Sequence, residues 1–112
     1  MEGVARSVRE PVIEVRDRPD ERRFVITVDG EAAGIATYRL RGDVMTFIHT
    51  EVSPPFGGRG LAARLAAGAL DDARRRGLRV VPLCPFIARY IREHAAYQDL
   101  VAADPSGGPQ PP

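Results

Sequence analysis

The sequence predicts an α/β domain (α+β, with a mixed sheet) in which an antiparallel β-meander precedes a β-α-β unit and a C-terminal helix. Three observations predict it: strand-like segments joined by short turns fill the first half, a helical period follows, and a short apolar run then precedes a second helical pattern. With 112 residues, 44% of them apolar, the chain has the size and composition of one globular domain. We expect this domain at residues 11–101, between a flexible N-terminus (1–10) and a disordered Pro/Gly-rich tail (102–112).

Four segments of the first half have the composition of β-strands. "VIEVRD" and "RRFVITV" are joined by the turn "RPDE", and Asp29-Gly30 is a strong hairpin signal that leads into "AAGIATYRL". A second turn, "RGD" at residues 41–43, precedes "VMTFIHTEV". Because antiparallel strands need only short connections, these segments predict a meander.

A helix follows in "RGLAARLAAGALDDARRRG". Its apolar residues recur at helical spacing, and Gly77 stands where a C-terminal cap belongs. Asp71 and Asp72 precede Arg75 and Arg76 by four residues, a spacing that supports a helix through ion pairs.

The segment after this helix predicts a second structural unit. "LRVVPLC" is a short apolar run typical of a buried strand, and "PFIARYIREHAAY" predicts a helix with Pro85 in its first turn. Residues 44–84 therefore form a predicted β-α-β unit with parallel strands.

Composition argues against several classes of function. The net charge is +1, with 15 acidic residues against 16 arginines and no lysine, which disfavours a nucleic-acid binder and excludes a lysine-dependent P-loop. One cysteine allows neither an internal disulfide nor a multi-cysteine zinc site, so no metal is expected. Without a long apolar run, we expect a cytoplasmic protein with no membrane contact.

The segment "PPFGGRG" places three glycines and Arg59 at a strand-to-helix junction. A helix N-terminus exposes unpaired N–H groups, and glycines let a ligand approach the backbone, so this junction favours a phosphate or pyrophosphate site. A surface turn with a helix cap is the alternative. Residues 58–63 also match G-x-G-x-x-A, but the following strand lacks the acidic residue of a dinucleotide site.

The longer stretch "VSPPFGGRGLAARL" resembles motif A of the GNAT acetyltransferase superfamily, V-x-P-x-x-[QR]-x-x-G-x-[GA]. Val52, Pro54, Gly60 and Ala62 match, whereas Gly57 replaces the Gln/Arg side chain. Three segments are similar to the small YjdJ-type branch: "FIHTEV", the strand ending "PLC", and "YIREHAAYQDLV". In the last segment, Ala95-Ala96 replace the Pro-Glu of typical members. The resemblance covers roughly residues 12–101.

The resemblance implies acetyl-coenzyme A as co-substrate and transfer of acetyl to an amine that the sequence does not specify. It implies cofactor binding by Val52, Gly57, Gly58, Arg59, Gly60, Leu61, Ala62, Cys84 and Pro85. Independently, Pro82 and Pro85 remove backbone donors around Cys84, so the strand is expected to part from its neighbour there. In GNAT folds such a split holds the pantetheine arm.

Strand alternation gives candidates for the general base. Along "VMTFIHTEV", period two places Met45, Phe47, His49 and Glu51 on one face, and Val44, Thr46, Ile48, Thr50 and Val52 on the other. His49 or Glu51 could deprotonate an amine. The alternative is a solvated Glu51 and a structural His49.

Two further side chains have both a catalytic and a structural interpretation. Cys84 is a candidate nucleophile or acetyl-pocket residue, and otherwise an inert buried thiol. Tyr90 stands where many GNAT enzymes carry the tyrosine that protonates the departing thiolate, and otherwise is a core aromatic. His94 and Tyr97 are interpreted as structural. A chain this short also leaves open a non-catalytic module that binds coenzyme A or an acyl-coenzyme A.

Overall fold

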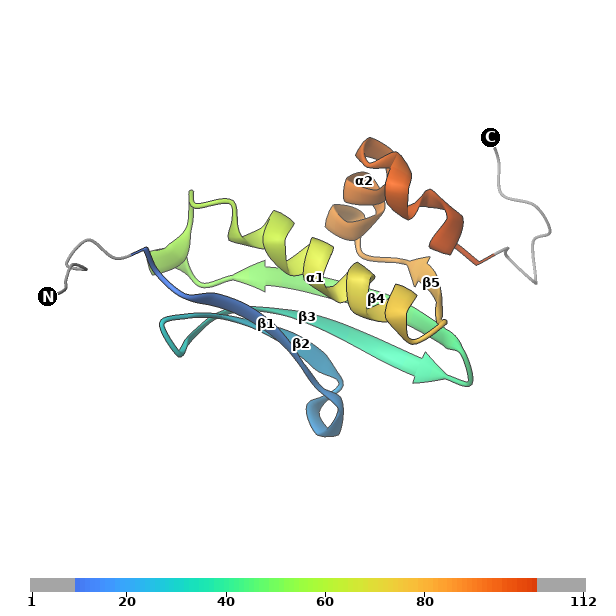
Figure 1. Cartoon of the computed structure of the whole chain (residues 1–112), viewed down its shortest axis with the longest axis horizontal. Helices are drawn as coiled ribbons and strands as arrows, with labels where there is room; N and C mark the ends of the chain where they lie inside the picture. Colours follow the sequence, from blue (N-terminus) through green and yellow to red (C-terminus); the bar gives the residue numbers. More distant parts are fainter. Residues whose placement is uncertain (1–9, 103–112) are drawn as a thin grey trace, which may run out of the picture.

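Five strands form one sheet in chain order, β1-β2-β3-β4-β5, in the computed structural model, which describes residues 10–102 (Figure 1). Neighbouring strands are antiparallel from β1 to β4, and β5 runs parallel to β4. The strands are β1 (Ile13–Arg18), β2 (Arg23–Val28), β3 (Glu31–Arg41), β4 (Val44–Val52) and β5 (Arg79–Pro82). The predicted meander and β-α-β unit are confirmed, while the predicted flexible ends lie almost wholly outside the described residues.

The helix α1 (Leu61–Arg75) connects β4 to β5 and packs across the sheet. Helix α1 packs closely on the sheet because small residues face it. Its buried stripe is rich in alanine, and a Cβ added at Gly68 would lie 2.8 Å from the Cβ of Val15 in β1. Gly77, at φ 71°, follows the helix end, and the N–H of Leu78 donates to the carbonyl of Ala73 at 2.9 Å. This is the glycine cap that the sequence predicted.

The second helix, α2 (Pro85–Glu93), is shorter than predicted. The chain is extended at His94 and continues as the 3-10 segment η4 (Ala95–Leu100). The side-chain amide of Gln98 donates to the carbonyls of Ile91 and Arg92, at 3.2 and 3.1 Å, which satisfies groups that the helix end leaves free. The predicted helix over 85–97 is therefore corrected to 85–93.

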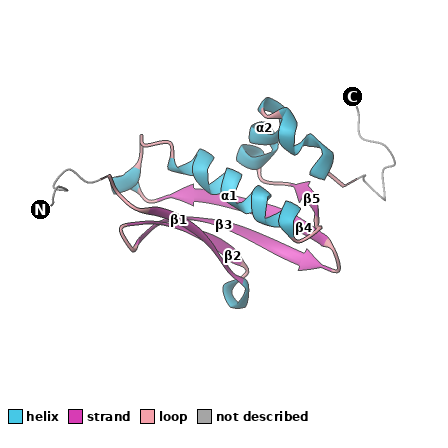
Figure 2. Ribbon diagram, in the orientation of Figure 1, coloured by secondary structure: helices cyan, strands magenta, loops and turns pink. Residues whose placement is uncertain are grey.

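Both helices lie on one side of the sheet (Figure 2). Their buried residues join those of β2, β3 and β4 in a single apolar core, whose largest fully buried members include Phe24, Phe47 and Leu65. None of the helices within residues 10–102 is long and apolar enough to cross a membrane.

A β-bulge interrupts the pairing of β3 with β4. Thr37 pairs with His49 whereas Tyr38 pairs with Phe47, so Ile48 is an extra residue on β4. An extra residue reverses the alternation of the side chains that follow it. The predicted faces are therefore wrong beyond Phe47: His49 and Glu51 lie on the open face of the sheet.

On the helix-covered face, Thr50 and Val52 follow Met45 and Phe47. Thr50 pairs with the buried Ala36, and Val52 is half-buried against the core. Residues that pair directly across two strands share a face. The bulge thus places Thr50 and Val52 on the side where α1 and α2 lie, although the alternation predicted them on the face opposite Phe47.

Candidate functional site

The loop between β4 and α1 contains a run of backbone N–H groups without partners. After the short 3-10 turn η3 (Pro54–Phe56), Gly58 and Gly60 both have positive φ, at 80° and 72°. Gly60 is the N-cap of α1 and offers no side-chain cap. Within the described chain, no loop or cap hydrogen bond uses the N–H of any residue from 58 to 63. Such a cradle is suited to a phosphate group.

Gly57 contributes differently from what its place in the motif predicts. Its φ is −64°, and its N–H donates to the carbonyl of Pro54 at 3.0 Å. The amide of Gly57 is therefore used inside the 3-10 turn, and the free donors begin at Gly58.

Arg59 supplies the positive charge of this loop. Its guanidinium carbon lies 5.4 Å from the centre of the Phe56 ring, a cation–π arrangement. Leu61, the first residue of α1, is buried and anchors the loop to the core, and Ala62 is half-buried beside it. The loop therefore combines an anchored backbone with an exposed cation.

β4 and β5 part beside this loop, as the two prolines predicted. Their pairing ends at Phe47 and Pro82, and the N–H groups of Leu83 and Cys84 both donate to the carbonyl of Phe47. Pro85, which has no N–H, then begins α2. Beyond Phe47, β4 has no strand partner on the β5 side within residues 10–102.

Cys84 lies at this split as the N-cap of α2 and is only 3% exposed. Its Sγ is 3.3 Å from the Oγ1 of Thr50. No base makes a hydrogen bond to the thiol among the described residues, and His49 and Glu51 lie on the other face of β4. The thiol is buried at the split and has no hydrogen-bonded base that would deprotonate it.

His49 and Glu51 form a pair on the open face of the sheet. The Nε2 of His49 is 3.0 Å from Oε1 of Glu51, and the two side chains are 60% and 61% exposed. Because they are in hydrogen-bond contact, either group can act as a base while the other orients it. The structure brings these two predicted residues together and separates them from Cys84.

Tyr90 lines a cavity of about 310 Å³ between α1 and α2, into which Ala63 of α1 also faces. Its ring stacks on that of His94 with centroids 3.9 Å apart, and Phe86 stacks on its other side along the helix. Burial raises the pKa of Tyr90, with a smaller contribution from Asp71, so the hydroxyl stays protonated. A neutral phenol in a partly buried cavity is a suitable proton donor.

Sequence reasoning missed Thr50 and assigned His94 a structural role only. Thr50 was placed on the wrong face because the bulge leaves no sign in a strand of alternating residue types. His94 accompanies Tyr90 in the cavity because the two are four residues apart, so they lie on one side of the chain at the helix end. Within the described residues no three His, Cys, Asp or Glu side chains are grouped as metal ligands.

Three comparisons bear on this arrangement. The sequence profile described as "GCN5-related N-acetyl-transferase" matches residues 23–100. Protein NATD1 of Gallus gallus is 30% identical over 95 residues, which cover 83% of this chain and 86% of that protein. Its counterpart in Homo sapiens is also 30% identical over 95 residues, with coverage of 81% and 84%.

A solved structure has the same fold. The NMR solution structure of a GCN5-like protein from Staphylococcus aureus superposes with a TM-score of 0.61 at 27% identity, covering 80% of this chain and 87% of that one. The resemblance to the superfamily is confirmed, while the assignment to the YjdJ-type branch stays a prediction. The chain belongs to the family of GCN5-related N-acetyltransferases.

Proposed function

We propose that the chain transfers acetyl from acetyl-coenzyme A to an amine. The observation that carries the proposal is the run of unpaired amides from Gly58 to the first turn of α1, next to the point where β4 and β5 part. A pyrophosphate needs several donors converging on one place, and a thioester arm needs an opening lined by backbone and small side chains. Here the part of β4 without a partner on the β5 side, residues 48–52, leads directly into the loop that carries the amides.

In this proposal the amides of residues 58–62 and the guanidinium of Arg59 hold the pyrophosphate. The cavity between α1 and α2, lined by Phe86 and Tyr90, accommodates the thiol-bearing arm. Thr50, Val52 and Cys84 line the path toward the split, where their half-buried or buried side chains exclude water. Pro85 has no N–H to donate, so this edge of the split stays unpaired.

The acceptor amine approaches from the opposite face of the sheet. There Glu51 or His49 removes the amine proton, and their 3.0 Å contact lets one orient the other. The amine then attacks the thioester carbonyl, backbone N–H groups stabilise the developing oxyanion, and Tyr90 protonates the thiolate that leaves. Direct transfer needs no covalent enzyme intermediate.

The burial of Cys84 and its lone Thr50 contact favour this direct route over acetylation of the thiol. A nucleophilic cysteine needs a base or a cation to generate its thiolate. Cys84 has neither among its hydrogen-bond partners. We therefore assign it to the wall of the acetyl pocket.

Thermal unfolding with different nucleotides tests the proposal. A ligand that binds only the folded chain raises its melting temperature by mass action. We expect stabilisation by acetyl-coenzyme A and by desulfo-coenzyme A, and a much smaller effect of NAD or ATP at the same concentration. No shift with either coenzyme A species at saturation would overturn it.

A second measurement separates an enzyme from a binding module. Release of free coenzyme A thiol is followed with a panel of primary amines, in the presence of acetyl-coenzyme A. We expect release that depends on the amine. Stabilisation by acetyl-coenzyme A without release for any amine would favour the module that only binds acyl-coenzyme A.

A further inference from the structure

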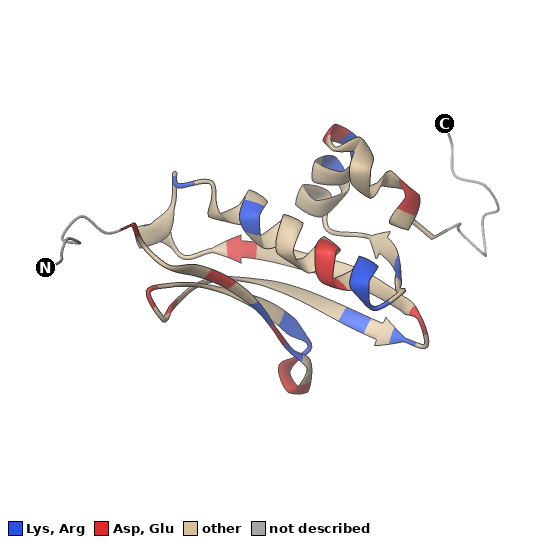
Figure 3. Ribbon diagram, viewed as in Figure 1, with Lys and Arg blue, Asp and Glu red and all other residues tan. Residues whose placement is uncertain are grey.

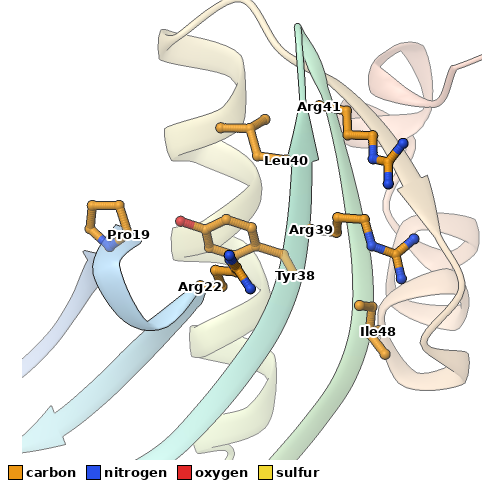
Figure 4. Close-up of a pocket in the computed structure, with 7 residues that line it drawn as sticks. All are labelled: Pro19, Arg22, Tyr38, Arg39, Leu40, Arg41 and Ile48. Carbon is orange, nitrogen blue, oxygen red and sulfur yellow. The ribbon is translucent and has the colours of Figure 1, made fainter.

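An open cavity of about 640 Å³ lies at the end of the sheet where β3 extends beyond β2 (Figure 4). The pairing of β2 with β3 ends at Arg23 and Thr37, and one more hydrogen bond joins the N–H of Tyr38 to the carbonyl of Arg22. Past this point β3 has no partner on that side within the described chain. Alternate residues turn their backbone groups to the same side, so the N–H of Leu40 lies at the open edge.

Three arginines, Arg22, Arg39 and Arg41, line this cavity. Figure 3 shows positive residues close together near the end of β3. Within residues 10–102, none of the three guanidinium groups has a carboxylate within 4.0 Å, whereas Arg74 and Arg76 are paired at 2.8 and 2.9 Å.

Of the acidic residues nearest in the chain, Asp20 and Asp43 make no ion pair within the described residues, whereas Glu21 and Asp17 are already engaged. Glu21 pairs with Arg18 and Arg23, and Asp17 accepts a hydrogen bond from the hydroxyl of Tyr38 at 2.6 Å. Three like charges around one cavity repel one another, and an anion from solution would offset that repulsion. The cavity is therefore electrostatically prepared for a negatively charged ligand.

The cavity adjoins the open-face site along β3 and β4. Ile48, the bulge residue, lines it and directly precedes His49. Arg39 is two residues from Thr37, which pairs with His49. The Cα atoms of Arg39 and Thr37 are therefore about 7 Å apart along the strand. In Figure 4 the side chains of Arg39, Arg41 and Ile48 lie on one side of β3, opposite Tyr38 and Leu40.

We infer that this cavity holds an anionic group, a carboxylate or a phosphate, of the acceptor amine. The inference rests on the proposed function and names its substrate class: an amine whose negative charge is several bonds from its nitrogen. Guanidinium groups bind carboxylate and phosphate oxygens in a bidentate manner, and the free N–H of Leu40 adds a donor. The exposed side chain of Ile48, on the same side of β3 as Arg39 and Arg41, provides apolar contact for the connecting chain.

The test is a titration of the full chain saturated with coenzyme A, so that its phosphate loop is occupied. The probes are two matched pairs, O-phosphoethanolamine with ethanolamine and γ-aminobutyrate with butylamine. Binding is followed through the backbone amide signals of residues 39–48. We expect each probe that carries a phosphate or carboxylate to bind about tenfold more tightly than its partner without that group, which is the contribution of one charge-assisted hydrogen-bonded contact. The stronger of the two anionic probes distinguishes phosphate from carboxylate.

The variant Arg39→Gln/Arg41→Gln should lose that preference, and Arg39→Lys/Arg41→Lys should retain part of it. Arg16→Gln/Arg92→Gln removes the same charge from exposed positions elsewhere and should keep the preference. Equal binding, by the unmodified chain, of the probes with and without the anionic group, or an undiminished preference in Arg39→Gln/Arg41→Gln, would overturn the inference.

Stabilisation by acetyl-coenzyme A is measured on the same proteins. If it persists while the anion preference is absent, only the inference fails. If the unmodified chain shows no stabilisation, the proposed function fails, and the assignment of the bound amine as an acceptor fails with it.

Discussion

The two faces of β4 beyond the bulge differ in burial and in charge. On the helix-covered face, Thr50 and Val52 are half-buried, and the nearby Cys84 is buried and uncharged. On the open face, His49 and Glu51 are more than half exposed and hydrogen-bonded to each other. The unpaired amides of the phosphate loop lie past the end of this strand, whereas the arginine-lined cavity lies behind the bulge.

On the proposed function, the two faces of this strand serve two different substrates. A single extra residue, Ile48, separates side chains that simple alternation would have grouped, so that uncharged and charged groups end on opposite faces. If the proposed function is right, variants on the helix-covered side should change the affinity for acetyl-coenzyme A. Variants on the open side should change only the chemistry or the acceptor.

The largest effect is expected from the open-face pair. The variant that removes the general base, either Glu51→Gln or His49→Gln, should lower kcat about a hundredfold or more. General base catalysis contributes about 10²–10⁴-fold to the rate. The other variant should have a smaller effect through lost orientation. Steady-state kinetics with a responsive amine measures both.

The control for this prediction is Glu31→Gln, which removes an exposed carboxylate at the N-terminal end of β3, four residues before Ile35, the partner of Glu51. It should leave kcat unchanged, and all three variants should bind acetyl-coenzyme A as the unmodified chain does. If either open-face variant weakened acetyl-coenzyme A binding, or if both kept kcat within threefold, the separation of the two faces would be wrong.

The second effect concerns the phosphate loop. Gly58→Ala forces a side chain into φ 80°, which costs about 1–2 kcal/mol in a left-handed conformation and tilts the free amides away from the ligand. We expect the Kd for acetyl-coenzyme A to rise about tenfold by calorimetry, which corresponds to ~1.4 kcal/mol. The KM for the acceptor should not change.

Gly30→Ala is a matched control, since Gly30 has φ 84° and open space around it and belongs to the β2–β3 turn, outside the loop. Its cost in unfolding free energy should equal that of Gly58→Ala. Equal losses of acetyl-coenzyme A affinity in the two variants would show that strain alone, and not the amide cradle, is responsible.

The sequence predicts the glycine loop and the parting of β4 from β5 better than the positions of His49 and Glu51, for a physical reason. Glycine is the residue type that left-handed backbone requires, so Gly58 and Gly60 mark the cradle directly, and two prolines mark the end of the β4–β5 ladder. A bulge position requires no particular residue type. Ile48 fits a regular strand equally well, so only the register with Thr37 and Tyr38 reveals it.

The arginine-lined cavity and the end of α2 were also beyond local reasoning. Arg22 and Arg41 are far apart in the chain and line one cavity only because β3 extends beyond β2. Likewise the helical pattern continues past Glu93, and α2 stops because Gln98 returns to the carbonyl of Ile91. Both depend on tertiary contacts that periodicity does not encode.

A smaller effect is expected in the pH dependence of stability. Burial, followed by the hydrogen bond to Asp71, raises the pKa of Tyr97 to about 12, above its ordinary value of about 10. Between these values the unfolded chain has lost the phenolic proton that the folded chain keeps. The free energy of unfolding should therefore fall as pH rises from about 10 to about 12.

Tyr97→Phe removes this part of the pH dependence and the 2.8 Å hydrogen bond that joins η4 to α1. We expect a loss on the order of 1 kcal/mol at neutral pH, and a flatter decline above pH ~10, in denaturant titrations. Because Tyr97 lies on the helix-covered side, bonded to Asp71 of α1, the KM for the acceptor should stay unchanged. A slope identical to that of the unmodified chain would contradict the assignment.

The smallest effect is expected at the residue whose chemistry attracts most attention. Cys84→Ala removes a buried thiol that touches Thr50 and has no base beside it. If Cys84 only lines the acetyl pocket, kcat should change by no more than about threefold, since shaping a pocket contributes ~1 kcal/mol or less, whereas loss of a covalent nucleophile costs several powers of ten. Rapid-quench mass spectrometry of the unmodified chain should show no acetyl group on Cys84. A burst of acetyl-enzyme that disappears in Cys84→Ala, together with a large loss of kcat, would move the chemistry to the helix-covered face. His49 and Glu51 could not then be its base, because they lie across the strand from the thiol.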